Sequence, residues 1–135
     1  MKLTTKSEYS LLAVIYIARA EKKNGELVRV EDISERYGIP RKYLEQLLLI
    51  LKQNGLLLAK RGANGGYRLA KPASRITAAQ VIRMMDGALA PSESVSKHFF
   101  SHTPIEKEKK MQGVLREIRD YVADRLEKLT LAELI

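Results

Sequence analysis

The sequence predicts a mainly α-helical fold with a small β-wing: a winged helix-turn-helix domain followed by a long C-terminal dimerisation helix. Two short helical patterns meet at Gly38-Ile39-Pro40, and the second runs into Asn54-Gly55. Two short strand-like segments follow, joined by a glycine-rich turn. A helix, a tight turn, a second helix and a β-ribbon, in this order, are the elements of a winged helix-turn-helix.

The composition sets limits on the kind of protein. A chain of 135 residues, 45% of them hydrophobic, is long enough for one domain, or for one domain with a dimerisation extension. Its net charge of +8 favours a polyanionic partner, although a basic chain could also suit a membrane surface. No apolar run of about 18 residues and no signal peptide is present, so we expect a cytoplasmic protein with no membrane partner.

The N-terminal part predicts a helix that lies inside the domain. Thr5 and Glu8 have the spacing of a capping box, with Thr5 as the N-cap. The residues that follow form one apolar stripe: Tyr9, Leu12, Ala13, Tyr16, Ile17 and Ala20. Apolar residues also lie outside it, so we expect contact with a further element or subunit. A turn, a short strand at Val28–Val30 and a helix from about Glu31 to Tyr37 should come next.

The second helix of the motif should begin near Pro40, which suits a first turn. Four leucines recur at helical spacing and should face the core: Leu44, Leu47, Leu48 and Leu51. The opposite side carries side chains of the kind that read base edges or bind phosphates: Arg41, Lys42, Tyr43, Glu45 and Gln46. An amphipathic helix with a solvated polar face would have the same pattern, but a basic hairpin follows at once and favours DNA binding.

That hairpin pairs Leu56–Lys60 with Tyr67–Leu69 across a glycine-rich turn. We expect Asn64 and Gly65 to supply the positive φ angles of a tight turn. The residues of the wing predicted to contact DNA are Lys60, Arg61, Asn64, Gly65, Gly66 and Tyr67. Glycine-rich loops that bind the phosphates of a nucleotide lead into a helix. Here a strand follows the loop, so the pattern argues against a nucleotide-binding loop.

After the wing, Thr77 and Gln80 form a capping box that opens a helix ending near Gly87. Ala88 to Ser101 has no clear period and should be a loop with at most one helical turn. Thr103-Pro104-Ile105-Glu106 then signals a helix of about 25 residues, about 37 Å long. A stripe of apolar residues predicts its dimerisation face: Met111, Leu115, Ile118, Val122, Leu126 and Leu129. The alternative is a helix folded back on its own domain. We therefore divide the chain into a DNA-binding domain (1–87), a regulatory loop (88–102) and a dimerisation helix with its tail (103–135).

The loop carries weaker signals. His98 and His102 could reach one metal ion if this segment were helical, with Glu93 or Glu106 nearby, but the ligand count is short. The pair Phe99-Phe100 should pin the loop to the core or line a small effector pocket. Ser94-Val95-Ser96-Lys97 matches the Ser-x-x-Lys motif of penicillin-recognising acylases, whose two other motifs are absent, so we predict no enzyme.

Nearly the whole chain resembles the Rrf-two (Rrf2) family of bacterial winged-helix transcriptional regulators, to which IscR, NsrR and CymR belong. The resemblance rests on the segments Ile33–Ile39, Tyr43–Leu47, Asn54–Leu56 and Arg61–Tyr67, on the opening Met1–Lys6 with Tyr9, and on Thr130–Leu134. It implies a homodimer that binds double-stranded DNA at a palindromic operator and regulates transcription, with repression expected. In that family, the residue matching Glu45 is implicated in reading bases.

The chain departs from the family in its loop. Cluster-binding members ligate an iron–sulfur cluster through three loop cysteines, but this chain has no cysteine, and its loop carries Ser92, Ser94, Ser96 and Ser101. Serine is a poor cluster ligand, so we expect no such cofactor. An engineered replacement of cysteine by serine would leave the same pattern. The resemblance then implies the cluster-independent branch, in which a partner protein modulates DNA binding, as in sulfur or cysteine metabolism. A regulator that senses a metal or small effector through the loop, and a winged-helix module for protein–protein contact, are the alternatives.

Overall fold

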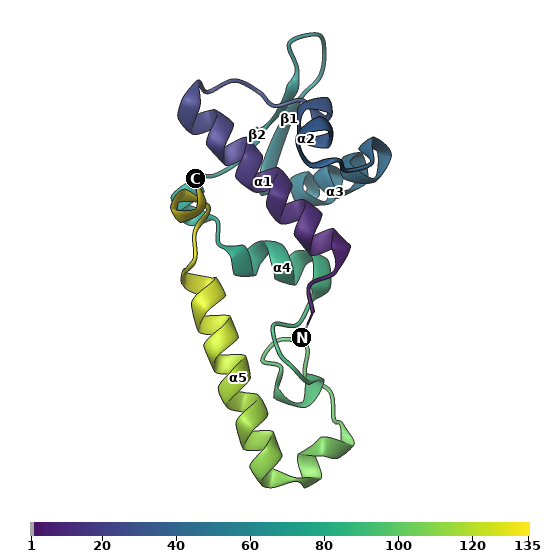
Figure 1. The fold of residues 1–135 in the computed structure, drawn as a ribbon, viewed down its shortest axis with the longest axis vertical. Helices are drawn as coiled ribbons and strands as arrows, with labels where there is room; N and C mark the ends of the chain where they lie inside the picture. Colours follow the sequence, from purple (N-terminus) through teal and green to yellow (C-terminus); the bar gives the residue numbers. More distant parts are fainter. Residues whose placement is uncertain (1) are drawn as a thin grey trace.

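The computed structural model describes residues 2–135 and has the expected fold class, five α-helices with a two-stranded antiparallel sheet (Figure 1). The helices are α1 (Thr5–Lys23), α2 (Val30–Tyr37), α3 (Arg41–Gln53), α4 (Ala78–Asp86) and α5 (Lys109–Lys128). The strands are β1 (Leu57–Lys60) and β2 (Gly66–Leu69), paired from Leu57 with Leu69 to Lys60 with Gly66. Short 3₁₀ turns lie at Ala73–Arg75, Glu93–Val95, Pro104–Lys107 and Leu131–Leu134.

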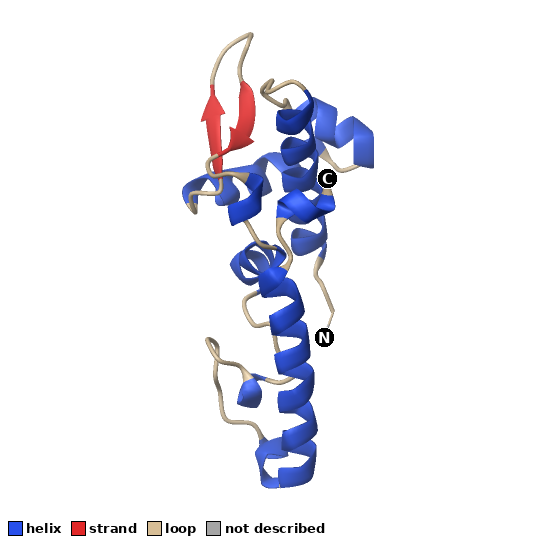
Figure 2. Ribbon diagram, turned by 90° about the vertical axis from the view of Figure 1, so that its left-hand side faces the viewer, coloured by secondary structure: helices blue, strands red, loops and turns tan. Residues whose placement is uncertain are grey.

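The molecule is elongated, with the winged-helix elements gathered at one end. Figure 1 shows α1, α2, α3 and the hairpin at that end, α4 below them, and α5 running along the other half. In Figure 2 the hairpin projects away from the helices, and the segment before α5 runs beside that helix. The wing and the exposed half of α5 are therefore at opposite ends of the protein.

The core lies between α1, α2, α3 and the base of the hairpin. The four leucines predicted to face inward from α3 are each at most 1% exposed: Leu44, Leu47, Leu48 and Leu51. Leu131, after α5, is also fully buried, and its N–H donates to the Ile76 carbonyl at 2.9 Å. The end of the chain thus returns to the winged-helix core and anchors α5 there.

The start of α1 differs from the prediction by one residue. Thr4, not Thr5, is the N-cap, and its hydroxyl accepts a hydrogen bond from the Ser7 N–H at 3.3 Å. Either threonine could cap the helix on local grounds. A carboxylate at the end of α4, Asp86, binds the hydroxyl and N–H of Thr4, which favours this threonine.

The segment before α2 is shorter and less regular than predicted. The helix already begins at Val30. Val28 forms a single backbone bridge with Tyr67 of β2, at 2.9 Å and 2.7 Å, in place of a strand. This bridge joins the entrance of the helix-turn-helix to the wing.

The predicted long helix is interrupted near its start. Thr103 and Glu106 do form a capping box, but it closes only the 3₁₀ turn Pro104–Lys107. Glu108 has φ −99° and ψ 88°, outside the helical region, so α5 begins at Lys109 and has 20 residues. At a rise of about 1.5 Å per residue it is about 30 Å long, shorter than predicted.

The apolar residues of α5 divide between two faces. Leu126 packs against a small second core of Ala79, Ile82 and Leu89. Four apolar side chains on the other face remain 43–74% exposed: Met111, Val114, Ile118 and Tyr121. The helix therefore packs on its own chain along one face and leaves an apolar stripe on another. Of the predicted dimerisation residues, Met111 and Ile118 belong to that stripe.

Candidate nucleic-acid interface

The outer face of α3 presents the polar side chains that the sequence placed there. Arg41, Lys42, Glu45 and Gln46 are exposed, whereas Tyr43 is half-buried. The Tyr43 ring packs edge-to-face on Tyr9 of α1, with ring centroids 5.9 Å apart. Four of the five side chains are thus exposed on the outer face of α3, and Tyr43 holds α3 against α1.

Arg41 is already paired on this face. Its Nη2 lies 2.7 Å from Glu31 Oε1 of α2, and its Nε lies 3.2 Å from Glu45 Oε1 of α3. Glu45 therefore has an ion-pair partner one turn before it on its own helix. Whether Glu45 also reads a base stays a prediction.

The wing turn has the predicted position but different backbone conformations. Within residues 2–135, the residues with a positive φ are all glycines, and Gly65 is not among them, so neither Asn64 nor Gly65 supplies the predicted positive φ. The positive values belong to Gly62, at +105°, and Gly66, at +154°. The reason is the loop length: the strands end at the Lys60–Gly66 pair, and five residues connect them rather than a two-residue turn.

Close backbone packing explains two of the wing glycines. Gly65 is buried, its N–H donates to the Gly62 carbonyl at 2.9 Å, and a side chain there would clash with the Lys60 carbonyl oxygen. A Cβ atom on Gly66 would lie 2.7 Å from the Val28 carbonyl oxygen. Both glycines shape the wing; their contact with DNA stays a prediction.

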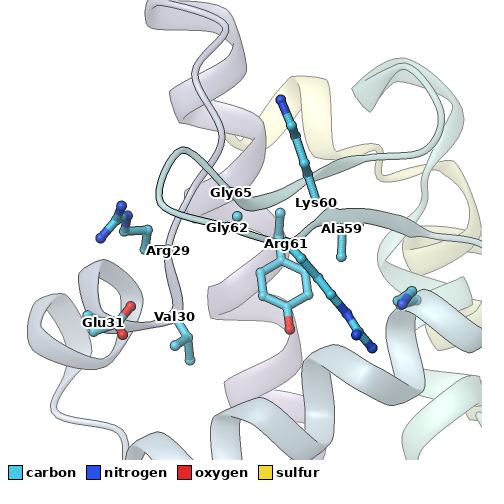
Figure 3. A pocket seen from close by; sticks show the side chains of 11 residues that line it. Arg29, Val30, Glu31, Ala59, Lys60, Arg61, Gly62 and Gly65 are labelled. Atoms are coloured by element: carbon cyan, nitrogen blue, oxygen red, sulfur yellow. The ribbon is translucent and has the colours of Figure 1, made fainter.

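A cleft of about 450 Å³ separates the wing from the start of α2 and the end of α3 (Figure 3). Four cationic side chains line the cleft: Arg29, Lys52, Lys60 and Arg61. The carboxylate of Glu31 and the ring of Tyr67 line it as well. In Figure 3, Lys60 and Arg61 point in opposite directions from the strand, so the wing presents positive charge on both sides. A basic cleft beside an exposed polar helix suits a phosphate backbone.

Arg29 and Lys52 were not predicted as part of this surface. The Arg29 guanidinium donates to the Ala63 carbonyl in the wing turn, so it also ties the turn to the start of α2. Residues 34 positions apart in sequence form this contact. No local pattern marks either residue, and only the folded hairpin brings them together.

The phenol of Tyr67, in the wing, lies close enough to Glu45 of α3 to be affected by its charge. Burial raises the pKa of the Tyr67 phenol, and the negative charge of Glu45 raises it further. The phenol is therefore protonated at neutral pH and available as a hydrogen-bond donor beside the cleft.

The two histidines of the loop before α5 were weak metal-ligand candidates, on the condition that the segment is helical. His98 and His102 lie in irregular backbone, so the helical spacing that would have joined them is absent. His102 Nδ1 instead lies 3.0 Å from Glu106 Oε2. Within residues 2–135, no group of three or more His, Cys, Asp or Glu side chains is placed to hold a metal ion.

Ser94 of the loop belongs to a buried hydrogen-bond network. Ser94, 5% exposed, donates through its hydroxyl to Gln112 Oε1, and Gln112 Nε2 donates to the Ser94 carbonyl, both at 3.1 Å. Arg119 donates to the Val95 carbonyl at 2.8 Å. Hydroxyls engaged in this way, in a chain without thiolates, do not fit the ligand set of an iron–sulfur cluster.

The two phenylalanines leave little room for a ligand. Phe99 and Phe100 are 48% and 54% exposed, so their rings are only partly packed against the rest of the chain. The cleft that Phe99 lines with Arg119 and neighbouring residues has a volume of only about 10 Å³. That is about the space one water occupies, so this cleft does not match the small-effector pocket considered from the sequence.

Within the part of the chain that the structure describes, no helix has both the length and the apolar character needed to span a membrane.

Comparison with known proteins agrees with this geometry. The family model Rrf2, described as an iron-dependent transcriptional regulator, matches residues 3–135. The regulator IscR of Erwinia tasmaniensis is 35% identical over 136 residues, covering 100% of this chain and 79% of that protein. IscR of Cereibacter sphaeroides is 41% identical over 86 residues, 64% of this chain and 56% of that protein. The solved structure of CymR (YrzC), the global cysteine regulator of B. subtilis, has a TM-score of 0.83 at 30% identity, covering 99% of this chain and 95% of the other.

Proposed function

Because the chain belongs to the Rrf2 family of transcriptional regulators, a family of DNA-binding proteins and not of enzymes, we propose that it represses transcription as a homodimer bound to a palindromic operator. The observation that carries this proposal is the joint surface of α3 and the wing. It combines the exposed polar side chains of the helix with the four cations of the neighbouring cleft.

The two parts of this surface suit different parts of a duplex. The exposed face of α3 carries Lys42, Glu45 and Gln46, which can bind guanine or phosphate, cytosine N4 and adenine respectively. The wing carries Lys60 and Arg61, whose positive charges can bind phosphates or enter the minor groove next to the major groove that α3 occupies. Helix-turn-helix proteins use the second helix of the motif in the major groove, which here is α3.

The exposed apolar stripe of α5 supports the homodimer. Met111, Val114, Ile118 and Tyr121 lie on one face of about three turns, and their side chains are 43–74% exposed. Two copies that pair these faces would bury apolar surface and relate their α3 helices by a two-fold axis. Such a dimer places its recognition helices in successive major grooves, about 34 Å apart.

The mode of regulation follows from the chemistry of the loop. We propose that this protein works without a cysteine-ligated iron–sulfur cluster, because its loop is held by serine and glutamine hydrogen bonds. A partner protein that modulates DNA binding is then the expected signal, and the likeness to a cysteine regulator makes sulfur or cysteine metabolism its proposed setting.

Selection of bound sequences from a random duplex pool tests the function. We expect enrichment of one inverted repeat, with half-sites about one helical turn apart and two protomers bound to each duplex. Enrichment of a single, unrepeated half-site would contradict the dimeric mode. Enrichment of nothing would favour the alternative, a winged-helix module that contacts proteins.

A further inference from the structure

Two carboxylates hold the first residue of α3. Arg41 contacts Glu31 at 2.7 Å, across the turn of the helix-turn-helix, and Glu45 at 3.2 Å, one helical turn further along α3. The three side chains are 42–57% exposed, so water and ions reach all of them. Arg41 is therefore at the surface, but its charge is already matched before any DNA arrives.

This pairing matters for DNA that lacks the operator. Sequence-independent binding comes from cations that replace the counter-ions of the phosphates. An arginine that remains with two carboxylates contributes little to that exchange, and the group of three carries a net negative charge. At the operator, contacts with base edges offset the loss of an exposed ion pair, whereas at other sequences nothing replaces it.

We propose that Glu31 is a specificity-determining residue, which holds Arg41 away from phosphates and so weakens binding to non-operator DNA. This inference rests on the proposed DNA-binding function and assigns a role to a residue of α2 that the helix-turn-helix pattern alone does not mark. Glu31 also lines the basic cleft beside the wing, the one carboxylate among its lining side chains (Figure 3).

The test compares Glu31→Gln with wild type on two duplexes, the selected operator and a scrambled sequence of equal length, over about 50–200 mM KCl. Glu35→Gln is the matched control. It removes the same charge one turn further along α2, from an exposed side chain that forms no ion pair in residues 2–135. Both substitutions are isosteric and lie on the surface, so both proteins should fold.

At the lowest salt concentration, we expect Glu31→Gln to bind scrambled DNA about two- to five-fold more tightly than wild type does. An effect of this size corresponds to the small free energy of an exposed ion pair. The variant's salt dependence should become steeper by about one phosphate contact for each protomer, and its affinity for the operator should change by less than about two-fold. Glu35→Gln should behave as wild type. Equal behaviour of the two variants would overturn the role of Glu31.

A double-mutant cycle shows whether Glu31 acts through Arg41. In the Arg41→Ala background, Glu31→Gln should no longer change the affinity for scrambled DNA. If the effect persists there, Glu31 repels phosphates directly and does not hold Arg41, and the proposal is wrong. Failure of the proposed function is a separate result, because wild-type protein would then prefer no duplex at all.

Discussion

Ser94 and Gln112 form a reciprocal pair of hydrogen bonds, each 3.1 Å long, between the loop and α5. Gln112 is only 4% exposed, and its amide satisfies both the hydroxyl and the carbonyl of Ser94. The side-chain amide therefore acts as a staple that orders the segment before α5 from within the protein.

We predict that Gln112→Leu loosens this loop. The substitution keeps the size of the side chain but leaves the buried Ser94 carbonyl without its partner and the Ser94 hydroxyl with Ser92 alone, at a cost of about 1–3 kcal/mol. Chemical denaturation should show this loss of stability, and hydrogen exchange should accelerate in residues 92–103. Gln53→Leu, at an exposed position at the end of α3, is the control and should change stability by less than about 0.5 kcal/mol.

The contact between Thr4 and Asp86 should make stability depend on pH in the acid range. Partial burial raises the pKa of Asp86, but hydrogen bonds from the hydroxyl and N–H of Thr4 and the charge of Lys6 outweigh it, so the pKa is lowered. A lowered pKa contributes stability above the unfolded value of about 3.9, and this is lost as the pH falls through the folded value.

Asp86→Asn should therefore destabilise the protein at neutral pH, by up to about 1 kcal/mol because the site is largely solvated. The difference from wild type should shrink below about pH 4. Urea denaturation of both proteins across this range measures it. A difference that stays constant with pH would mean that the charge of Asp86 contributes nothing.

The exposed stripe of α5 should be the dimer contact. Ile118→Asp puts a charge in its middle, and we expect monomers at micromolar concentration by light scattering, with operator binding lost because one half-site is too weak alone. Arg116→Asp places the same side chain about 200° around the helix and should stay dimeric. Dissociation of both variants, or of neither, would contradict this assignment.

Structural features that depend only on residues close together in the sequence were predicted well. The four leucines of α3 repeat at the helical period, and all four are buried. The capping box of Thr77 and Gln80 needs only neighbours in sequence, and both of its hydrogen bonds are present. The helix-turn-helix and the wing could thus be placed from the chain alone.

Two of the misplaced features depend on contacts between distant segments. Thr4 rather than Thr5 caps α1 because Asp86, 82 residues away, binds it. The capping box at Thr103 was real, but the chain leaves the helical region at Glu108. A period of three and four residues also cannot tell which face of α5 packs on its own chain, so the exposed positions of Val114 and Tyr121 were missed.

Glu45 and Arg61 should divide recognition between sequence and charge. Arg61→Ala should weaken binding to every duplex and lower the salt slope by about one for each protomer. Glu45→Ala should relax discrimination at one base pair by about 1–3 kcal/mol, and should not weaken binding to scrambled DNA. Titration of both variants against operator and scrambled duplexes measures this. An equal loss on both duplexes for Glu45→Ala would mean that Glu45 has only its structural role beside Arg41.

The salt dependence of binding to the selected operator tests the central claim most directly. Fluorescence anisotropy of a labelled duplex would be recorded with wild-type protein at KCl concentrations between about 50 and 200 mM. Each protomer presents four cations at the cleft beside α3. A dimer that uses most of them should lose affinity with a log–log slope steeper than about −4, and should prefer the operator to scrambled DNA at every salt concentration. A slope near zero, or equal affinity for the two duplexes, would contradict sequence-specific DNA binding by this surface.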